Sequence, residues 1–466
     1  MNDLLDQPAR TIAAAVRDGH FSATEIVAAS LGRAHAMAEC NAFVAVLDEA
    51  AGEAAAALDR LSSDARKKLP LLGVPFAAKD MTPTEGTATT LGSWTSGDTP
   101  ATDTALVVRR LQAAGAVLIG KTTTPEFANS GFTASPRWGT TRNPCDKTRS
   151  PGGSSGGSGA AVAAGCVPFA EGTDMGGSVR IPAAFCGVVG LKPSLGRIPM
   201  TILPSLFDDI SHFGPLARTV DDAGLFMAAA SGPSDEDPFS LPLAFDEVAT
   251  HPVIGLAGRR LALSMDLGFF AVLPGVRDAV TAAVERLRDA GAVVTEVALP
   301  WTRDVVDRWT DLWGVFMATY FGERRIEFAE RMDPAVLALM ARGDALGAVA
   351  VKHIELLRSR MWRDMAAVLA THEALLCPTC AVLPPPVERT DDDYAADDAE
   401  GRFAGLDMCS PFNMVPMLPV ISLPVPRPAG ALPVGLQVVG RRHGDEALLA
   451  LARLIERVFQ SKLEYS

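Results

Sequence analysis

From Leu71 onwards, short apolar runs alternate with longer stretches in which apolar residues recur every three or four positions. The short runs are typical of buried β-strands, and the longer stretches are typical of amphipathic α-helices. The strand-like runs are LLGVPFAAK (71–79), AVLIGK (116–121), VPFAEGT (167–173), RRLALSM (259–265) and AVVTEVAL (292–299). The helical stretches are DTALVVRRLQAAG (103–115), SGAAVAAG (158–165), DAGLFMAAAS (222–231) and VRDAVTAAVERLRDAG (276–291). This alternation predicts an α/β fold, a layered domain around a mostly buried sheet.

The chain before this region is predicted to be helical. Residues 8–60 read as helices, and Ser22 and Glu25 have the S-x-x-E spacing of a capping box that opens one of them. His35 lies on a predicted helix of this section, and we interpret it as a surface or packing residue.

A further helix is predicted between Trp301 and Phe321. It carries one apolar stripe with the spacing i, i+4, i+8 and i+11, formed by Trp309, Trp313, Met317 and Tyr320. Such a stripe usually faces the core. The alternative is that part of this stripe lines a substrate pocket.

Composition and charge limit the function classes. With 466 residues, 48% of them hydrophobic and 21% charged, the chain can bury a large core. Its net charge of −13 argues against a nucleic-acid-binding surface, which needs clustered lysine and arginine. The N-terminus lacks a cationic start followed by an unbroken apolar core, and no window approaches 18 consecutive apolar residues. We therefore expect a cytoplasmic protein with no signal peptide and no membrane partner.

Cysteines and acidic residues suggest no metal site. The seven cysteines are odd in number and scattered, which fits reduced, buried thiols. Cys377 and Cys380 form a C-x-x-C pair, but neither a second pair nor a histidine cluster accompanies them. The acidic stretch Thr390–Gly401 is predicted to be a solvated loop.

Two serines wrapped in glycine carry the candidate chemistry. Ser154 lies in GGSSGG (152–157), and Ser178 lies in DMGGSVR (174–180). Flanking glycines let backbone N–H groups approach a ligand closely, and such groups can hold a developing oxyanion while an activated serine attacks a carbonyl. Lys79 ends a predicted buried strand, where desolvation favours its neutral form and makes it a candidate base. The pattern therefore favours acyl transfer.

These motifs, taken in order, resemble the amidase signature family of serine hydrolases. The resemblance rests on GVPFAAKD (73–80), PGGSSGGSGAAVAAG (151–165) and GTDMGGSVRIPAAFCGVVGLKPS (172–194), and it extends to AAGAVLIGKTTTPEFANSGF (113–132), WGTTRNPCD (138–146), GPLARTVDDAGLF (214–226) and LPVGLQVVGRRHGDEALLALA (432–452). It implies a single α/β/α domain over residues 1–466, with a mixed central sheet wrapped by helices. Within that domain we expect an N-terminal helical section (1–69), a signature core with the triad (70–230) and a helical substrate-pocket section (about 300–375).

The resemblance implies a Ser-cisSer-Lys triad. Ser178 matches the nucleophile, Ser154 matches the serine that follows a cis peptide bond and relays a proton, and Lys79 matches the base. The N–H groups of the loop that ends at Ser178 match the oxyanion hole, and neighbouring side chains match residues that support it. The oxyanion-hole donors implied are the N–H groups of Met175, Gly176, Gly177 and Ser178, the supporting residues are Ser155, Asp174 and Arg180, and the candidate substrate-binding residues are Asn129, Trp313 and Met317.

The implied activity is hydrolysis of a small carboxamide, or a related C–N acyl compound, through a Ser178 acyl-enzyme. The products are a carboxylate and ammonia or an amine, and no cofactor or metal is implied. The lysine base predicts a neutral to alkaline optimum. A homodimer is compatible with the family. Pro416, Met417 and Met81 stand where the family pattern commonly has other residues, which leaves the substrate open.

Three alternative classes share parts of these motifs. Residues 152–156 satisfy the G-x-S-x-G pattern of α/β-hydrolase esterases, but the preceding stretch is turn-rich and none of the candidate histidines (His212, His251, His353, His372 and His443) has a distinctive setting. A phosphate-binding loop would need a G-K-[ST] end that is missing. A glutaminase-type subunit of a tRNA-dependent amidotransferase usually has glutamine where this chain has Ile181.

Overall fold

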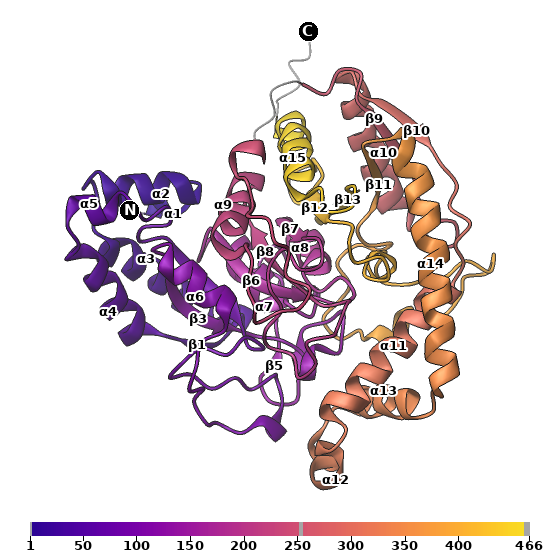
Figure 1. Ribbon diagram of the computed structural model, residues 1–466, viewed down its shortest axis with the longest axis horizontal. Helices are drawn as coiled ribbons and strands as arrows, with labels where there is room; N and C mark the ends of the chain where they lie inside the picture. Colours follow the sequence, from indigo (N-terminus) through magenta and orange to yellow (C-terminus); the bar gives the residue numbers. More distant parts are fainter. Residues whose placement is uncertain (1, 251–254, 461–466) are drawn as a thin grey trace.

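One large mixed sheet forms the centre of the computed structural model, which describes residues 2–250 and 255–460 (Figure 1). In spatial order its strands are β1 (Phe43–Val46), β3 (Val117–Thr122), β2 (Pro75–Lys79), β6 (Phe169–Asp174), β8 (His212–Ala217), β7 (Val189–Lys192), β12 (Val420–Pro424), β13 (Gly435–Val439), β11 (Ala374–Pro378), β9 (Arg260–Leu263) and β10 (Val293–Glu296). Strands β3, β2 and β6 pair in parallel, as do β11, β9 and β10. The strands between these two groups pair antiparallel. A small hairpin, β4 (Ala134–Ser135) and β5 (Gly139–Thr140), stands apart.

Helices cover both faces of this sheet. The Phe169 ring on β6 meets Phe226 edge-on at a centroid distance of 5.6 Å, whereas Gly172 on the same strand faces the Ser155 side chain. Residues 169 and 172 leave opposite faces of a strand because side chains alternate. Phe226 belongs to α9 and Ser155 precedes α7, so these two helices lie on opposite faces. The α/β fold with a mixed central sheet is therefore confirmed.

The described chain contains α-helices along its whole length, and four of them follow the periodic stretches predicted after Leu71. Those in the first half are α1 (Asn2–Leu5), α2 (Ala9–Arg17), α3 (Ala23–Ala36), α4 (Asp48–Asp59), α5 (Ser63–Arg66), α6 (Leu106–Ala113), α7 (Gly156–Ala163), α8 (Arg180–Cys186) and α9 (Val220–Ala230). Those in the second half are α10 (Pro274–Asp289), α11 (Asp304–Phe321), α12 (Arg324–Phe328), α13 (Pro334–Asp344), α14 (Ala348–Thr371) and α15 (Asp445–Gln460). The predicted capping box is present, since Ser22 accepts from the Glu25 N–H and Glu25 accepts from the Ser22 N–H. His35 lies on the surface beside Asp48.

One predicted helical section contains a strand. Residues 43–46 form β1, which pairs antiparallel with the outer edge of β3. A run of four residues is too short to show a period, and its strand structure comes from pairing with β3, a partner about 75 residues away in sequence.

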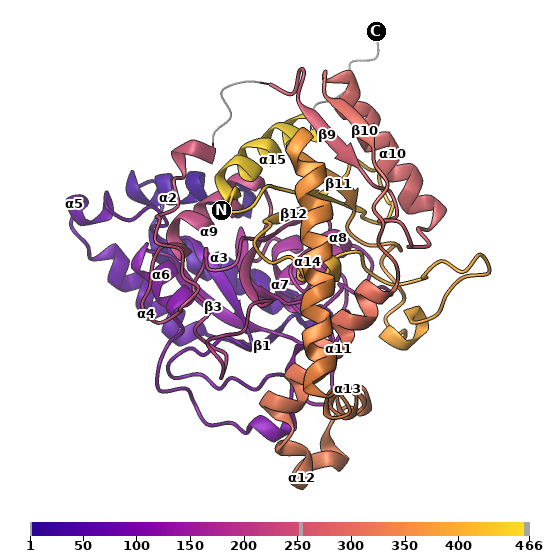
Figure 2. The same cartoon turned by 45° about the vertical axis from the view of Figure 1, so that its right-hand side comes forward.

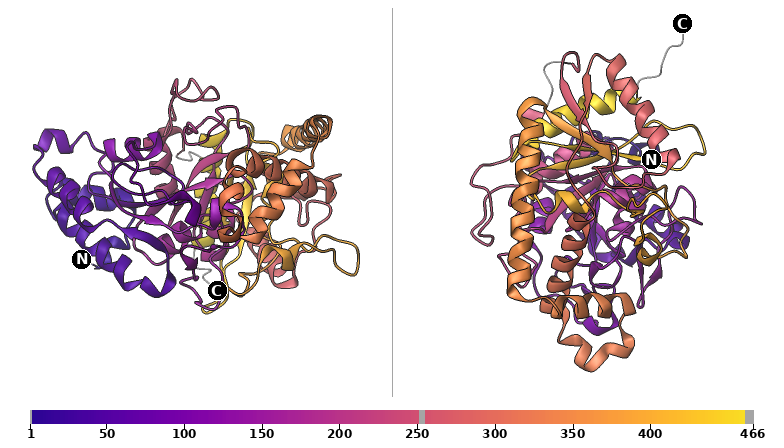
Figure 3. Two further views of the ribbon diagram at one scale, coloured as in Figure 1. Left: turned by 90° about the horizontal axis from the view of Figure 1, so that it is seen from below. Right: turned by 90° about the vertical axis from the view of Figure 1, so that its right-hand side faces the viewer.

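The orange helices of the second half gather at one end of the molecule. In Figure 1, α11, α13 and α14 lie on the side away from the indigo helices α2, α4 and α5. The turned view shows α14 running along the outside of α11 (Figure 2), and the separation from the N-terminal helices persists in the view from below (Figure 3). Among the described residues, no single helix is long and apolar enough to cross a membrane, and α13 and α14 reach that threshold only as a pair bent by 97°.

Candidate active site

Lys79 is the last residue of β2, and its side chain is fully buried. Its Nζ donates to Ser154 Oγ at 2.6 Å and to Thr173 Oγ1 at 2.9 Å. Burial lowers the pKa of Lys79 from 10.5 to about 7, and the carboxylates of Glu171 and Asp174 offset part of that effect. The amine therefore changes charge near neutral pH, within hydrogen-bonding distance of a serine.

Ser154 lies in the loop that leads into α7. Its side chain is fully buried, and the Gly153–Ser154 peptide bond is cis, as the resemblance implied. A Cβ atom at Gly153 would lie 2.6 Å from the Ser130 carbonyl oxygen, so only glycine fits here without movement of the backbone. The sequence thus brings Ser154 to Lys79 through a loop that is packed against the segment after β3.

Ser155 joins the two glycine-rich segments. Its N–H donates to the Ser178 carbonyl at 3.1 Å, and its hydroxyl lies 3.3 Å from both the N and the O of Thr173. These contacts hold the Ser154 loop beside the end of β6 and beside Ser178. Ser178 is half-buried, unlike Lys79 and Ser154. Within the described part of the chain, its hydroxyl makes no hydrogen bond.

Asp174 ends β6 and organises the loop that contains Ser178. One carboxylate oxygen accepts from the Gly177 N–H at 2.9 Å, and the other accepts from the Val179 N–H at 3.2 Å. Arg180 forms two further bonds to the same carboxylate, both at 2.9 Å. Burial opposes ionisation, but the Arg180 guanidinium outweighs it and holds the pKa of Asp174 well below its usual range.

The Gly177 contact changes one expectation. The resemblance placed the Gly177 N–H in the oxyanion hole, but in the structure it donates to Asp174. This N–H points toward the carboxylate because Gly177 has φ +121°, a conformation that glycine tolerates. The N–H groups of Met175, Gly176 and Ser178 donate to no acceptor among residues 2–250 and 255–460.

Two residues that the sequence reasoning missed complete the support of Asp174. Arg180 donates to Asn413 Oδ1 at 2.6 Å and to Gln437 Oε1 at 2.8 Å. Asn413 in turn donates to Asp174 Oδ1 at 3.0 Å. All of these side chains are buried. Because Asn413 and Gln437 lie more than 230 residues after Arg180, only the folded chain reveals the contact.

Glu171 was also missed, although it lies in a predicted strand. Its carboxylate accepts from the Lys79 N–H at 2.8 Å and from the Thr82 hydroxyl at 3.0 Å, and it is fully buried. Burial raises its pKa, and these two hydrogen bonds together with the Lys79 amine oppose that effect. A charged residue inside an apolar strand-like run was the available signal.

The candidate substrate-binding residues differ in their surroundings. Trp313 Nε1 donates to the Asn129 carbonyl at 3.4 Å, which places these two residues side by side. The Asn129 side-chain oxygen is buried without a hydrogen-bond partner in the described chain. Met317 is wholly enclosed by the apolar cluster around Trp313, Val336 and Met340, so it has no surface for a substrate. The expectation for Met317 is thus replaced by a core role.

The histidines do not support an α/β-hydrolase site. No described histidine forms a hydrogen bond with the Ser154 or Ser178 side chain, and His251 lies outside the described residues. His212 is buried among backbone carbonyls, and burial, together with Lys192, lowers its pKa to about 3. In addition, Ser154 follows a loop and not a strand. The described residues contain no group of three or more potential metal ligands.

The acidic stretch is partly docked. Asp391 attaches this stretch to the segment after β3: it accepts hydrogen bonds from the Ser130 hydroxyl and, at 3.2 Å, from the Gly131 N–H, although its side chain remains on the surface.

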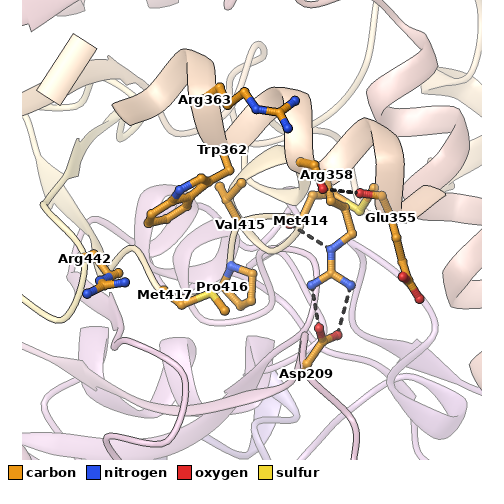
Figure 4. Close-up of a pocket in the computed structure, with 11 residues that line it drawn as sticks. Asp209, Glu355, Arg358, Trp362, Arg363, Met414, Val415, Pro416, Met417 and Arg442 are labelled. Atoms are coloured by element: carbon orange, nitrogen blue, oxygen red, sulfur yellow. Dashed lines mark hydrogen bonds and ion pairs between the residues drawn. The ribbon is translucent and has the colours of Figure 1, made fainter. Parts of the chain in front are cut away.

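A separate cavity of about 710 Å³ lies between α14 and residues 414–417, where the two terminal guanidinium nitrogens of Arg358 donate to Asp209 (Figure 4). None of Lys79, Ser154 and Ser178 lines this cavity.

Comparison with known proteins defines the class. The family model described as Amidase matches residues 25–449. The chain is 36% identical to an acylamidase of Rhodococcus erythropolis, with 97% of this chain and 95% of the relative covered. It is 33% identical to a glutamyl-tRNA(Gln) amidotransferase subunit of Chloroflexus aurantiacus, with coverages of 96% and 95%.

Solved structures agree with this class. A bacterial aryl acylamidase superposes with a TM-score of 0.90 at 28% identity, covering 97% of this chain and 96% of that one. The peptide amidase of Stenotrophomonas maltophilia gives a TM-score of 0.83 at 27% identity, covering 99% of each chain. The chain belongs to the amidase signature family, and it is a hydrolase of carbon–nitrogen bonds in linear amides.

Proposed function

We propose that this chain is a stand-alone acylamidase in which Ser178 forms an acyl-enzyme, Ser154 relays the proton and Lys79 is the base. The observation that carries the proposal is the fully buried Lys79 amine, 2.6 Å from Ser154 Oγ and with its pKa lowered to about 7. A lysine with that pKa is largely neutral above pH 7 and can accept a proton. The proposal treats residues 1–466 as one domain with its working centre in residues 70–230.

The proton path follows from these contacts. Ser178 Oγ attacks the amide carbonyl carbon as its proton passes to Ser154 and the Ser154 proton passes to Lys79. The carbonyl π electrons move onto oxygen and form a tetrahedral oxyanion. On collapse, the C–N bond breaks and the leaving nitrogen takes the proton from Ser154, which regains one from Lys79. Water then attacks the acyl-enzyme by the same relay, which releases the carboxylate and frees Ser178.

The oxyanion requires donors that are already in place. The N–H groups of Gly176 and Ser178 serve this purpose in the proposal, with the Met175 N–H beside them, because none of the three is used within the described fold. Asp174 and Arg180 fix the loop that presents them. Removal of one such donor typically lowers the rate by about 100- to 1000-fold, so the loop geometry is central to the rate.

Asn129, Trp309 and Trp313 suggest the substrate class. The two tryptophan rings stack with centroids 6.3 Å apart, and Trp309 is half-buried beside the oxyanion loop. The unpaired Asn129 oxygen can accept an amide N–H. An apolar, aromatic wall beside one acceptor fits an aryl or alkyl amide, and the acylamidase and aryl acylamidase relatives support this choice.

A panel of amides tests the proposal. We expect purified protein to release amine or ammonia from small anilides and aliphatic amides, and Ser178→Ala, Ser154→Ala and Lys79→Ala to remove most of this activity while the fold persists. Thermal unfolding of each variant provides the control for folding. Full activity of Ser178→Ala or Lys79→Ala would refute the mechanism.

The second candidate is a glutaminase-type subunit, which the 33% identical amidotransferase relative favours. It predicts that simple amides are not hydrolysed and that glutamine is hydrolysed only when partner subunits are present. Ile181 stands where such subunits usually have glutamine. Turnover of anilides by the isolated chain would decide for the acylamidase.

A further inference from the structure

Trp309 on α11 makes a direct contact with the oxyanion loop. Its indole Nε1 donates to the Met175 carbonyl at 3.0 Å. The same ring lies against Gly176, where a Cβ atom would stand 2.1 Å from Trp309 Cζ2. Trp309 therefore holds the peptide unit between Met175 and Gly176 by one hydrogen bond and by packing.

That peptide unit is a single planar group. Its carbonyl belongs to Met175 and its N–H belongs to Gly176, and in a trans peptide the two point in opposite directions. Fixing the carbonyl toward α11 consequently fixes the Gly176 N–H on the side away from α11. Among the described residues this N–H has no acceptor, so its direction is available for a ligand.

The side chain of Asp174, which holds the rest of the loop, makes no hydrogen bond to this peptide unit. Asp174 binds the N–H groups of Gly177 and Val179 but not that of Gly176. At the next residue, a Cβ atom on Gly177 would stand 2.5 Å from Cys409 Cβ. The loop is thus packed against the indole at Gly176 and against Cys409 at Gly177.

We propose that Trp309 is a positioning residue of this enzyme, which aims the Gly176 N–H at the developing oxyanion through its hydrogen bond to the Met175 carbonyl. This inference rests on the proposed function of Ser178 and its loop. It assigns to α11 a part in transition-state stabilisation in addition to its part in the pocket wall. The expected consequence is a rate effect that appears in kcat and not in KM.

Trp309→Phe removes the N–H donor and keeps an aromatic ring. We expect kcat and kcat/KM for the fastest amide of the panel to fall together by about tenfold, because one hydrogen bond of ordinary strength is lost from the support of a donor. KM should stay within about twofold, and the position of the acidic limb of the pH profile should not move. Trp301→Phe is the matched control, since it removes an indole N–H donor, to Asp364 at 3.1 Å, from a buried side chain that has no part in the proposed site.

Phenylboronic acid probes the oxyanion site without turnover. Its boron forms a bond to Ser178 Oγ, the Ser178 proton leaves through the relay, and the resulting tetrahedral anion places an oxygen in the oxyanion hole. We expect its inhibition constant to rise about tenfold in Trp309→Phe, in proportion to the loss in kcat, and to stay unchanged in Trp301→Phe.

Gly176→Ala gives a second test if Trp309→Phe lowers stability. Gly176 does not adopt a positive φ, so alanine suits its backbone, and the added methyl meets the indole. Both substitutions disturb one contact, so the double variant should lose no more kcat than the worse single variant.

Unchanged kcat in Trp309→Phe, a loss seen only in KM, or an equal loss in Trp301→Phe would overturn the inference. Full activity of Ser178→Ala would instead refute the proposed function itself. Loss of activity in Ser178→Ala combined with normal kcat in Trp309→Phe would refute the positioning role alone.

Discussion

The charge state of Lys79 sets a limit on activity at low pH. With a pKa of about 7, Lys79 is about 90% neutral at pH 8. An ordinary lysine with a pKa of 10.5 would be only about 0.3% neutral at that pH, so burial increases the available base by about 300-fold. Protonation at lower pH removes the base, and kcat/KM should fall about tenfold for each pH unit below 7.

Glu171→Gln tests whether this limb belongs to Lys79. The carboxylate favours the charged amine, so its removal lowers the pKa of Lys79 further, and the limb should move to lower pH. Glutamine keeps the local contacts, since its oxygen can accept from the Lys79 N–H and its amide nitrogen can donate to the Thr82 hydroxyl.

Two other buried lysines, Lys121 and Lys192, make the assignment demanding. Glu171 also acts on Lys121, but the Lys121 amine donates to the Thr82 carbonyl, whereas the Lys79 amine donates to Ser154. Burial lowers the pKa of Lys192 to about 7 as well, but the charges that act on it are Arg180, Asp174 and Asp445. Glu171 is absent from that set, so a limb that arises from Lys192 would stay in place in Glu171→Gln. The assay is kcat/KM for an anilide between pH 5 and pH 9, with a check that the protein stays folded. A flat profile across pH 6–8, or a limb that does not move in Glu171→Gln, would refute Lys79 as the base.

Two further predictions concern stability. Arg180→Met leaves the buried Asp174 carboxylate without its cation, so the free energy of unfolding in urea should fall by about 3–5 kcal/mol and turnover should be lost. As a control, Arg303→Met breaks the exposed pair with Asp397 and should lower the free energy of unfolding by less than about 1 kcal/mol. Met317→Ala should lower the free energy of unfolding by about 2–5 kcal/mol without a change in KM, and Met317→Leu by less than about 1.5 kcal/mol. An altered substrate preference in Met317→Leu at unchanged stability would show that Met317 reaches the substrate after all.

The pattern of apolar and polar residues predicted many of the helices and strands correctly. The five strand-like runs and the four helical stretches after Leu71 are all present in the structure. Strands β7, β8, β11, β12 and β13 were not predicted, and β12 and β13 carry the polar residues Ser422 and Gln437 at buried positions. Those residues are tolerated inside the sheet because they are hydrogen-bonded, to Thr379 and Arg180 respectively.

For the candidate site as well, the sequence predicted some residues correctly but not how they contact one another. Spacing and glycine content indicated Ser154, Ser178 and Lys79 as candidates, but the contacts among these three side chains were implied only by the resemblance to a family. The stripe on α11 was found from its period, yet a period does not say which residue faces the site. Trp309 is half-buried beside the oxyanion loop, and Met317, two turns later, is in the core. Neighbouring side chains, and not helix geometry alone, decide that difference.

The Asp174 carboxylate explains how one short loop serves two purposes. Of four consecutive N–H groups, those of Gly177 and Val179 donate to Asp174, and those of Gly176 and Ser178 have no acceptor in the described chain. The ionised carboxylate is the stronger acceptor for these N–H groups, and Arg180 keeps it ionised against the cost of burial. Arg180 is itself held by Asn413 and Gln437, far along the chain. The two unused donors thus depend on an ion pair buried behind the loop, so a substitution that never touches substrate can remove the oxyanion site.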